Sequence, residues 1–140
     1  MMQTASDQSV PASGQWSVSR AVGIIGVAGP YDFLPLRDPE LMTIFGSESE
    51  RPRSQPINYV TPQAPPMLLL AGRDDTTVDP GNTLRLAAKL REAGVAAQSE
   101  LYPGVGHVTI IGAVARPLGF LAPTRSDALR FINALAPCGS

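Results

Sequence analysis

The stretch from Met67 to Pro80, MLLLAGRDDTTVDP, decides the fold. Its first part, Met67–Ala71, is a continuous apolar run, which is typical of a strand buried on both faces of a parallel sheet. Gly72 and several polar residues end this strand. Asp79 and Pro80 then start a helix, because aspartate is a favoured N-cap and proline is favoured in the first turn. A strand followed by a turn and a helix predicts an α/β fold with a parallel sheet.

Two further strands extend this unit in both directions along the chain. Upstream, Ala21–Ala28 reads AVGIIGVA, a second continuous apolar run rich in β-branched residues. Downstream, an amphipathic helix ends at Gly94, and Gln98–Tyr102 follows as a shorter third strand. A last amphipathic helix covers about 125–135. The sequence therefore predicts about three parallel strands with flanking helices.

The connection between the first two strands, residues 29–66, is long and rich in proline. Asp38 and Pro39 predict a short helix that stops at Gly46. The remainder, Ser47 to Pro66, is predicted to be irregular, and long loops of this kind are usually functional or mobile.

Length and charge limit the classes of function. A chain of 140 residues suits one domain, which we predict at 20–140 after a disordered or poorly packed lead-in at 1–19. Eleven basic and twelve acidic residues give a net charge of -1 and no basic stripe, so no nucleic acid and no membrane surface is expected as a partner. No apolar run approaches the roughly 18–20 residues of a membrane span.

The chain has one cysteine, Cys138, and one histidine, His107. A disulfide within the chain, a cysteine metal cluster and a two-histidine metal site are therefore impossible, and neither a metal nor an organic cofactor is implied. The N-terminus has no basic segment followed by an apolar one, so we expect no secretory signal and, by default, a cytoplasmic protein.

Asp75 and His107 both follow the predicted carboxyl end of a strand, where ligands bind in parallel α/β sheets. An aspartate that orients a histidine is two thirds of a nucleophilic hydrolysis triad, in which the histidine takes the proton of a serine. A simpler interpretation also stands at this point: His107 is a turn histidine, and Asp74 and Asp75 belong to a solvated loop.

Several motifs, in this order, resemble α/β-hydrolase carboxylesterases, and most closely the group akin to feruloyl esterases and kynurenine formamidase. The segment 29–36 (GPYDFLPL) resembles the part after the sixth strand of that fold. The approach to the catalytic acid in that family resembles three parts of this chain: 56–60 (PINYV), 65–70 (PPMLLL) and the pattern Gly72-x-x-Asp75-x-x-Val78-x-Pro80. The histidine loop of the family resembles 102–107 (YPGVGH). The resemblance covers about 20–136.

The resemblance implies a partial α/β-hydrolase fold, its C-terminal half, with Asp75 as the triad acid and His107 as the base. Asp74 is a weaker candidate, because the family places the acid three residues after Gly72. Tyr31 and Asp32 are candidates for the substrate pocket, or they only shape the turn after the first strand. The implied substrate is a small ester.

The chain departs from the family in one large respect, since it contains no G-x-S-x-G nucleophile elbow. Ser13, Ser17 and Ser19 lack glycines at the elbow spacing, and the glycine-rich loop of the oxyanion hole is also missing. We therefore expect a serine-esterase half that is inactive in isolation and needs a chain carrying the N-terminal half. The alternative is an inactive truncated remnant that acts, if at all, as a binding or interaction domain. A flavodoxin-like ligand-binding domain is a third reading, weakened by the lack of any phosphate-binding glycine motif.

The strand Val22–Ala28 raises a physical problem in such a half-fold. It is apolar on both faces, and without an upstream neighbour it exposes a hydrophobic edge. We expect self-association or aggregation through this edge.

Overall fold

The computed structural model describes residues 21–135. The predicted lead-in at 1–19 and Cys138 lie outside these residues. Three strands, β1 (Ile24–Val27), β2 (Met67–Gly72) and β3 (Ala97–Tyr102), form a parallel sheet in the order β1-β2-β3. This confirms the predicted parallel sheet.

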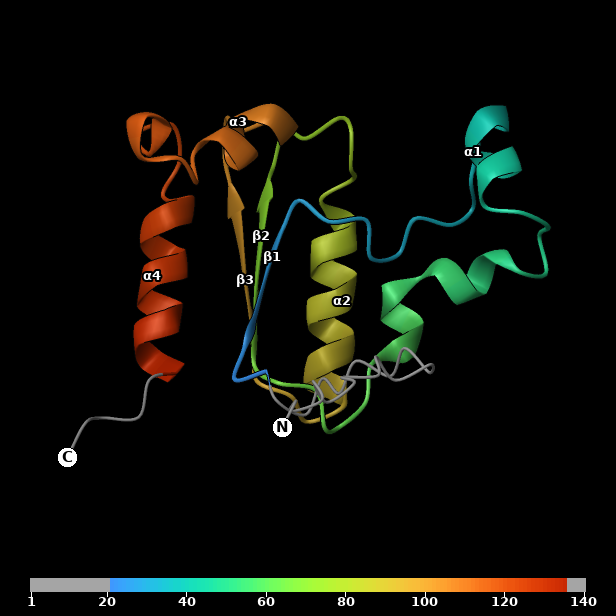
Figure 1. Cartoon of the computed structure of the whole chain (residues 1–140), viewed down its shortest axis with the longest axis horizontal. Coiled ribbons are helices and arrows are strands. Elements are labelled where there is room, and N and C mark those ends of the chain that lie inside the picture. Colours follow the sequence, from blue (N-terminus) through green and yellow to red (C-terminus); the bar gives the residue numbers. More distant parts are fainter. Residues whose placement is uncertain (1–20, 136–140) are drawn as a thin grey trace, which may run out of the picture.

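Helices cover both faces of the sheet. Helix α2 (Gly81–Glu92) packs on one face and α4 (Thr124–Leu135) on the other, so that the body has three layers (Figure 1). Within residues 21–135, none of the helices is both long enough and apolar enough to span a bilayer.

The central strand β2 explains why its sequence is an unbroken apolar run. Successive side chains point to opposite faces of a sheet, and both faces of β2 are covered. Leu68 and Leu70 pack into the cluster under α4, whereas Leu69 packs into the cluster under α2. All three leucines are buried, with Leu70 fully inaccessible.

By contrast, β1 is an edge strand whose four residues are only half-buried. Its inner edge pairs with β2, from Ile24 opposite Met67 to Val27 opposite Leu70. Just before β1, a Cβ atom on Gly23 would overlap Leu135 and crowd Phe131, so this glycine lets α4 approach the sheet closely.

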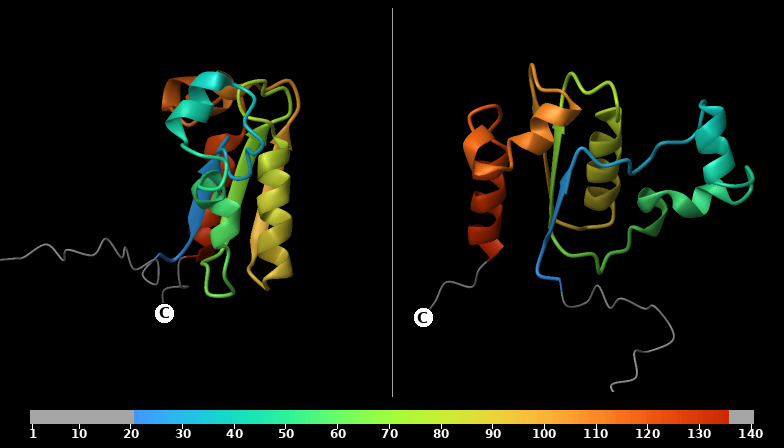
Figure 2. Two further views of the ribbon diagram at one scale, coloured as in Figure 1. Left: turned by 90° about the vertical axis from the view of Figure 1, so that its right-hand side faces the viewer. Right: turned by 45° about the horizontal axis from the view of Figure 1, so that its top comes forward.

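The connection between β1 and β2 leaves the body as an arm, residues 33–60, which extends beside α2 (Figures 1 and 2). It contains α1 (Pro39–Ile44) and the 3-10 turns η2 (Arg51–Ser54) and η3 (Pro56–Tyr59). The predicted cap is confirmed, since Asp38 Oδ1 accepts the N–H of Glu40 at 2.8 Å. The arm is fixed at its base by buried Gln55, whose Oε1 accepts the N–H of Phe33 at 2.7 Å.

One boundary of the predicted elements was wrong. Helix α2 begins at Gly81 with Pro80 at the N-cap, one residue later than expected, although Asp79 Oδ1 still accepts the Gly81 N–H at 3.0 Å. Two further elements, α3 (His107–Gly112) and the 3-10 turn η4 (Arg116–Leu118), lie between β3 and α4 and were not predicted. The short α3 is rich in β-branched residues, which favour helices poorly; burial of Ile110 in the core compensates for this.

Candidate active site

Asp75 lies in the turn that follows β2, and its side chain is completely buried. Its Oδ1 atom accepts the backbone N–H groups of Thr77 and Val78, both at 2.8 Å. Short aspartate side chains stabilise turns in this way. The turn therefore fixes the carboxylate and leaves its second oxygen, Oδ2, directed at another partner.

That partner is His107, whose Nδ1 lies 2.8 Å from Asp75 Oδ2. His107 is the first residue of α3, and 24% of its side chain is exposed. Two backbone contacts hold its loop against the Asp75 turn: the Asp74 N–H donates to the carbonyl of Val105, and the Arg73 N–H donates to that of Tyr102. The absence of a side chain at Gly72 allows this, because a Cβ there would overlap the Val105 carbonyl oxygen.

The hydrogen bonds around Asp75 decide its protonation. Burial alone would raise the pKa of the carboxyl group, but the hydrogen bonds from the Val78 amide, His107 and the Thr77 amide outweigh it, so the pKa lies below its ordinary value. An ionised carboxylate only accepts, so Nδ1 of His107 must carry the proton. Among residues 21–135, Nε2 of His107 has no hydrogen-bond partner and is left to accept a proton.

A second buried pair, which sequence reasoning missed, supports the histidine loop. The Tyr102 hydroxyl at the end of β3 donates to Asp127 Oδ2 at 2.5 Å, and Asp127 also pairs with Arg130. Burial, together with the adjacent Asp127, raises the pKa of Tyr102, so its hydroxyl keeps its proton. The only sequence signal was an acid in the first turn of an otherwise amphipathic helix.

The other candidate residues make different contacts. Asp32 forms an ion pair with Arg85 of α2 at 2.5 Å, and its backbone N–H donates to Asn82 Oδ1 at 2.6 Å. Tyr31 lies over the backbone of Gly26 in β1, and burial raises the pKa of its hydroxyl. Neither residue has a hydrogen bond to the Asp75–His107 pair in the described part of the chain.

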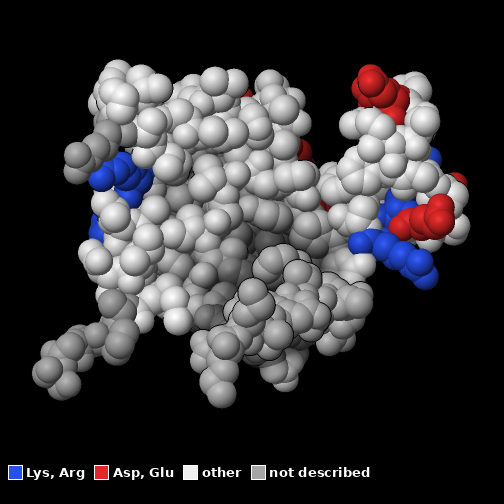
Figure 3. All heavy atoms as spheres, viewed as in Figure 1, with Lys and Arg blue, Asp and Glu red and all other residues white. Residues whose placement is uncertain are grey.

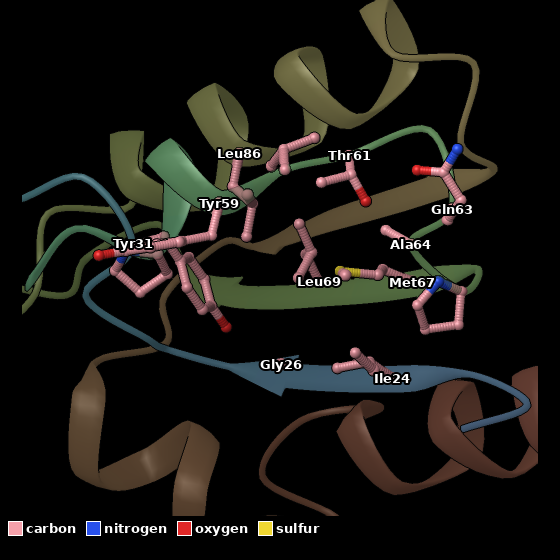
Figure 4. Close-up of a pocket in the computed structure, with 13 residues that line it drawn as sticks. Ile24, Gly26, Tyr31, Tyr59, Thr61, Gln63, Ala64, Met67, Leu69 and Leu86 are labelled. Carbon is pink, nitrogen blue, oxygen red and sulfur yellow. The ribbon is translucent and has the colours of Figure 1, made fainter. Parts of the chain in front are cut away.

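Tyr31 instead lines a groove of about 470 Å³ on the α2 side of the sheet (Figure 4). The groove is mostly apolar, and its floor is formed by Ile24, Met67 and Leu69. Asp75 and His107 are not among its lining residues. The groove and the acid–base pair are therefore separate features. In residues 21–135, no group of three His, Cys, Asp or Glu side chains could hold a metal ion.

Comparisons with known proteins give the same fold. The model of the prolyl oligopeptidase family (peptidase S9) matches residues 33–120, more than half of the chain. No curated protein matches the chain.

Solved structures resemble the chain over part of their length. The carboxylesterase Cest-2923 from Lactobacillus plantarum WCFS1 is 17% identical with a TM-score of 0.66, over 84% of this chain and 46% of that one. A truncated carbohydrate esterase from gut microbiota is 21% identical (TM-score 0.64), over 81% of this chain and 42% of that one. Thermogutta terrifontis esterase 2, phosphoramylated by tabun, is 22% identical (TM-score 0.59), over 94% and 49%.

The chain thus spans about half the length of these structures, which confirms the expected partial fold and the resemblance to α/β-hydrolase esterases. At these identities the structures show the fold alone, whereas the family model matches the sequence itself. The chain belongs to the prolyl oligopeptidase family and adopts part of the α/β-hydrolase fold.

Proposed function

We propose that this chain carries the acid–base half of a serine hydrolase that cleaves small carboxylic esters. One observation carries the proposal: the buried Asp75 carboxylate accepts a 2.8 Å hydrogen bond from Nδ1 of a partly exposed histidine, whose Nε2 is free within residues 21–135. The nucleophile and the oxyanion hole come from a polypeptide segment outside these 140 residues, because the sequence contains no G-x-S-x-G.

In the proposed reaction, Nε2 of His107 takes the proton of the serine hydroxyl as its oxygen attacks the ester carbonyl. The imidazolium then gives this proton to the departing alcohol, which leaves an acyl-enzyme. Water attacks the acyl group in the second half, again with His107 as the base, and releases the acid and the free serine. Asp75 holds the Nδ1–H tautomer and stabilises the imidazolium in both halves.

The choice of ester as substrate rests on the similar structures, three of which are described as esterases. The reaction of one of them with the organophosphorus compound tabun also supports a serine nucleophile. The family name suggests prolyl peptides as the competing substrate class. Hydrolysis of a p-nitrophenyl ester against a prolyl p-nitroanilide distinguishes the two.

The test is labelling by a fluorophosphonate probe, which captures activated serine nucleophiles. The chain is assayed alone and mixed with an N-terminal half of an α/β-hydrolase that carries the elbow and the glycine-rich loop. We expect no label on the chain alone and a label on the elbow serine in the mixture. His107→Gln and Asp75→Asn should abolish that label, whereas Asp74→Asn, at the exposed neighbouring carboxylate, should retain it.

Two results would contradict the proposal. A label that persists in His107→Gln would show that His107 is not the base. A mixture that forms a stable complex but takes no label would favour the alternative function, an inactive binding or interaction domain.

A further inference from the structure

A buried pair of side chains, Tyr102 and Asp127, joins the end of β3 to the first turn of α4. The Tyr102 hydroxyl donates to Asp127 Oδ2 at 2.5 Å, and both residues are less than a tenth exposed. Asp127 Oδ1 pairs with Arg130, whose side chain is 78% exposed. Over α4, the face shown in Figure 3 accordingly carries basic side chains and no acidic one. The hydroxyl and the carboxylate therefore meet inside the protein, away from solvent.

The same tyrosine packs against the backbone segments on either side of the histidine. Tyr102 belongs to one buried cluster with Val105 and Ile110. Val105 lies two residues before His107, and Ile110 lies three residues after it in α3. A shift of the Tyr102 ring would therefore move the histidine loop and α3 together.

His107 depends on this packing, because α3 gives it little support of its own. The helix has six residues, and a helix of that length is unstable unless other elements pack against it. Its N-cap is Gly106, which has no side chain to cap the helix. In the described part of the chain, the His107 side chain makes one hydrogen bond, to Asp75. The alignment of the ring with Asp75 is therefore set by where α3 packs.

The polar pair supplies direction rather than stability. Two apolar side chains of similar shape would bury the same surface, and replacing both partners of a buried polar contact in this way is often nearly neutral. A hydrogen bond depends on direction, whereas an apolar contact does not. The bond between Tyr102 and Asp127 therefore favours a single arrangement of β3 against α4.

We propose that Tyr102 and Asp127 are positioning residues, which hold the histidine loop so that the His107 ring stays aligned with Asp75. The inference rests on the proposed function, in which His107 is the base. Neither residue of the pair touches the reacting atoms, and both act through the loop. Because the pair lies within β3 and α4, its effect on His107 is measurable in this chain alone.

The first test measures how fast the Nδ1 proton of His107 exchanges with water, by NMR of the full chain at a pH at which the imidazole is neutral. The double variant Tyr102→Phe/Asp127→Leu removes both polar partners and leaves only the exposed Arg130, so its thermal midpoint should stay close to that of the wild type. We expect the Nδ1 proton to exchange about tenfold faster in this variant, because the ring leaves Asp75 more often. Asp127→Asn, whose amide oxygen still accepts from Tyr102, should keep the slow exchange.

Two controls separate positioning from a general loss of stability. Tyr59→Phe removes a hydroxyl that donates to the Arg53 carbonyl on the arm, and it should leave the exchange unchanged. Val95→Ala removes buried apolar groups before β3, at the opposite end of the strand from His107, so it should lower stability without changing the exchange. Slow exchange in the stable double variant would overturn the proposal. An equal acceleration in Val95→Ala would also overturn it, since any loss of stability would then have the same effect.

The second test uses the chain complemented by an N-terminal half. The double variant should lower kcat for ester hydrolysis about tenfold and leave KM unchanged, because the alignment of the base matters in the transition state and not for substrate binding. An unchanged kcat would overturn the proposal. If the complemented wild type is itself inactive, the proposed function fails, whereas the exchange measurement on the chain alone still decides the role of the pair.

Discussion

The carboxyl end of β2 and the outer edge of β1 belong to the same three-stranded sheet but differ in how completely they are surrounded. Around β2, strands lie on both sides and helices on both faces, and its last five residues are buried. Along β1, every residue is half-buried, and one side has no neighbour in the described part of the chain. Asp75 follows β2, the enclosed central strand, and His107 follows its neighbour β3, so the pair is built on these two strands and not on β1.

This difference shows why half of a fold can keep a precise site. The geometry of Asp75 and His107 depends on the Asp75 turn, on Gly72 and on the backbone contacts to Val105, all of which lie within β2, β3 and their loops. None of these contacts involves β1. The geometry of the pair therefore depends only on β2, β3 and the loops that follow them.

The largest expected effect is that of His107→Gln on the complemented enzyme. Loss of the base should lower the rate of ester hydrolysis by about 10⁶-fold, as removal of a triad histidine does. The thermal midpoint should change little, because His107 is partly exposed at the start of a short helix. Kinetics and thermal unfolding on one preparation check both, and retained activity would contradict the assignment.

The next effect compares the core with the edge. Leu70→Ala removes a fully buried side chain of β2 and should lower the free energy of unfolding by about 2–5 kcal/mol. Val27→Ala on β1 removes a half-buried side chain and should lower it by about 1 kcal/mol. Urea unfolding at low protein concentration measures both. Equal losses would mean that β1 is as enclosed in solution as β2.

A pair of glycine substitutions sharpens the same comparison. Gly72→Ala forces the backbone at Val105 to move, so it should destabilise the fold by about 1–3 kcal/mol and displace His107. Gly26→Ala on β1 meets chiefly the end of the Tyr31 side chain, which can rotate away, so the loss should be smaller. Unfolding curves, with the fluorophosphonate label of the complemented enzyme, check both variants. A larger loss for Gly26→Ala would contradict this account.

How far the sequence predicted this structure depended on how local each signal was. The unbroken apolar runs predicted the parallel strands, and the Asp38-Pro39 pair predicted α1, because burial and capping act within a few residues. The spacing of Asp75 and His107 placed them at one end of the sheet. The Tyr102–Asp127 pair and the site of Asp32 beside Arg85 depend on contacts between distant segments, so no local pattern indicated them.

The smallest expected effect is on the pH dependence of stability. The pKa of Asp75 is lowered on folding, so its ionised form stabilises the folded state above the unfolded pKa of about 3.9, and this contribution is lost as the pH falls through the lower folded pKa. Asp75→Asn should therefore flatten the loss of stability below about pH 4, where unfolded Asp titrates. Asp74→Asn, at the exposed neighbour, is the control and should not change it. Acid unfolding monitored by circular dichroism measures the stability of each variant as the pH falls. Identical profiles for the wild type and Asp75→Asn would contradict the lowered pKa of Asp75.

The central claim is that Asp75 holds His107 ready to act as a base, and the tautomer of the imidazole tests it most directly. Long-range ¹H–¹⁵N NMR of the full chain, at a pH at which the imidazole is neutral, distinguishes a protonated Nδ1 from a protonated Nε2. We expect the proton on Nδ1, with a bare Nε2, and loss of this preference in Asp75→Asn. A neutral histidine that carries its proton on Nε2, or a preference unchanged by Asp75→Asn, would contradict the account.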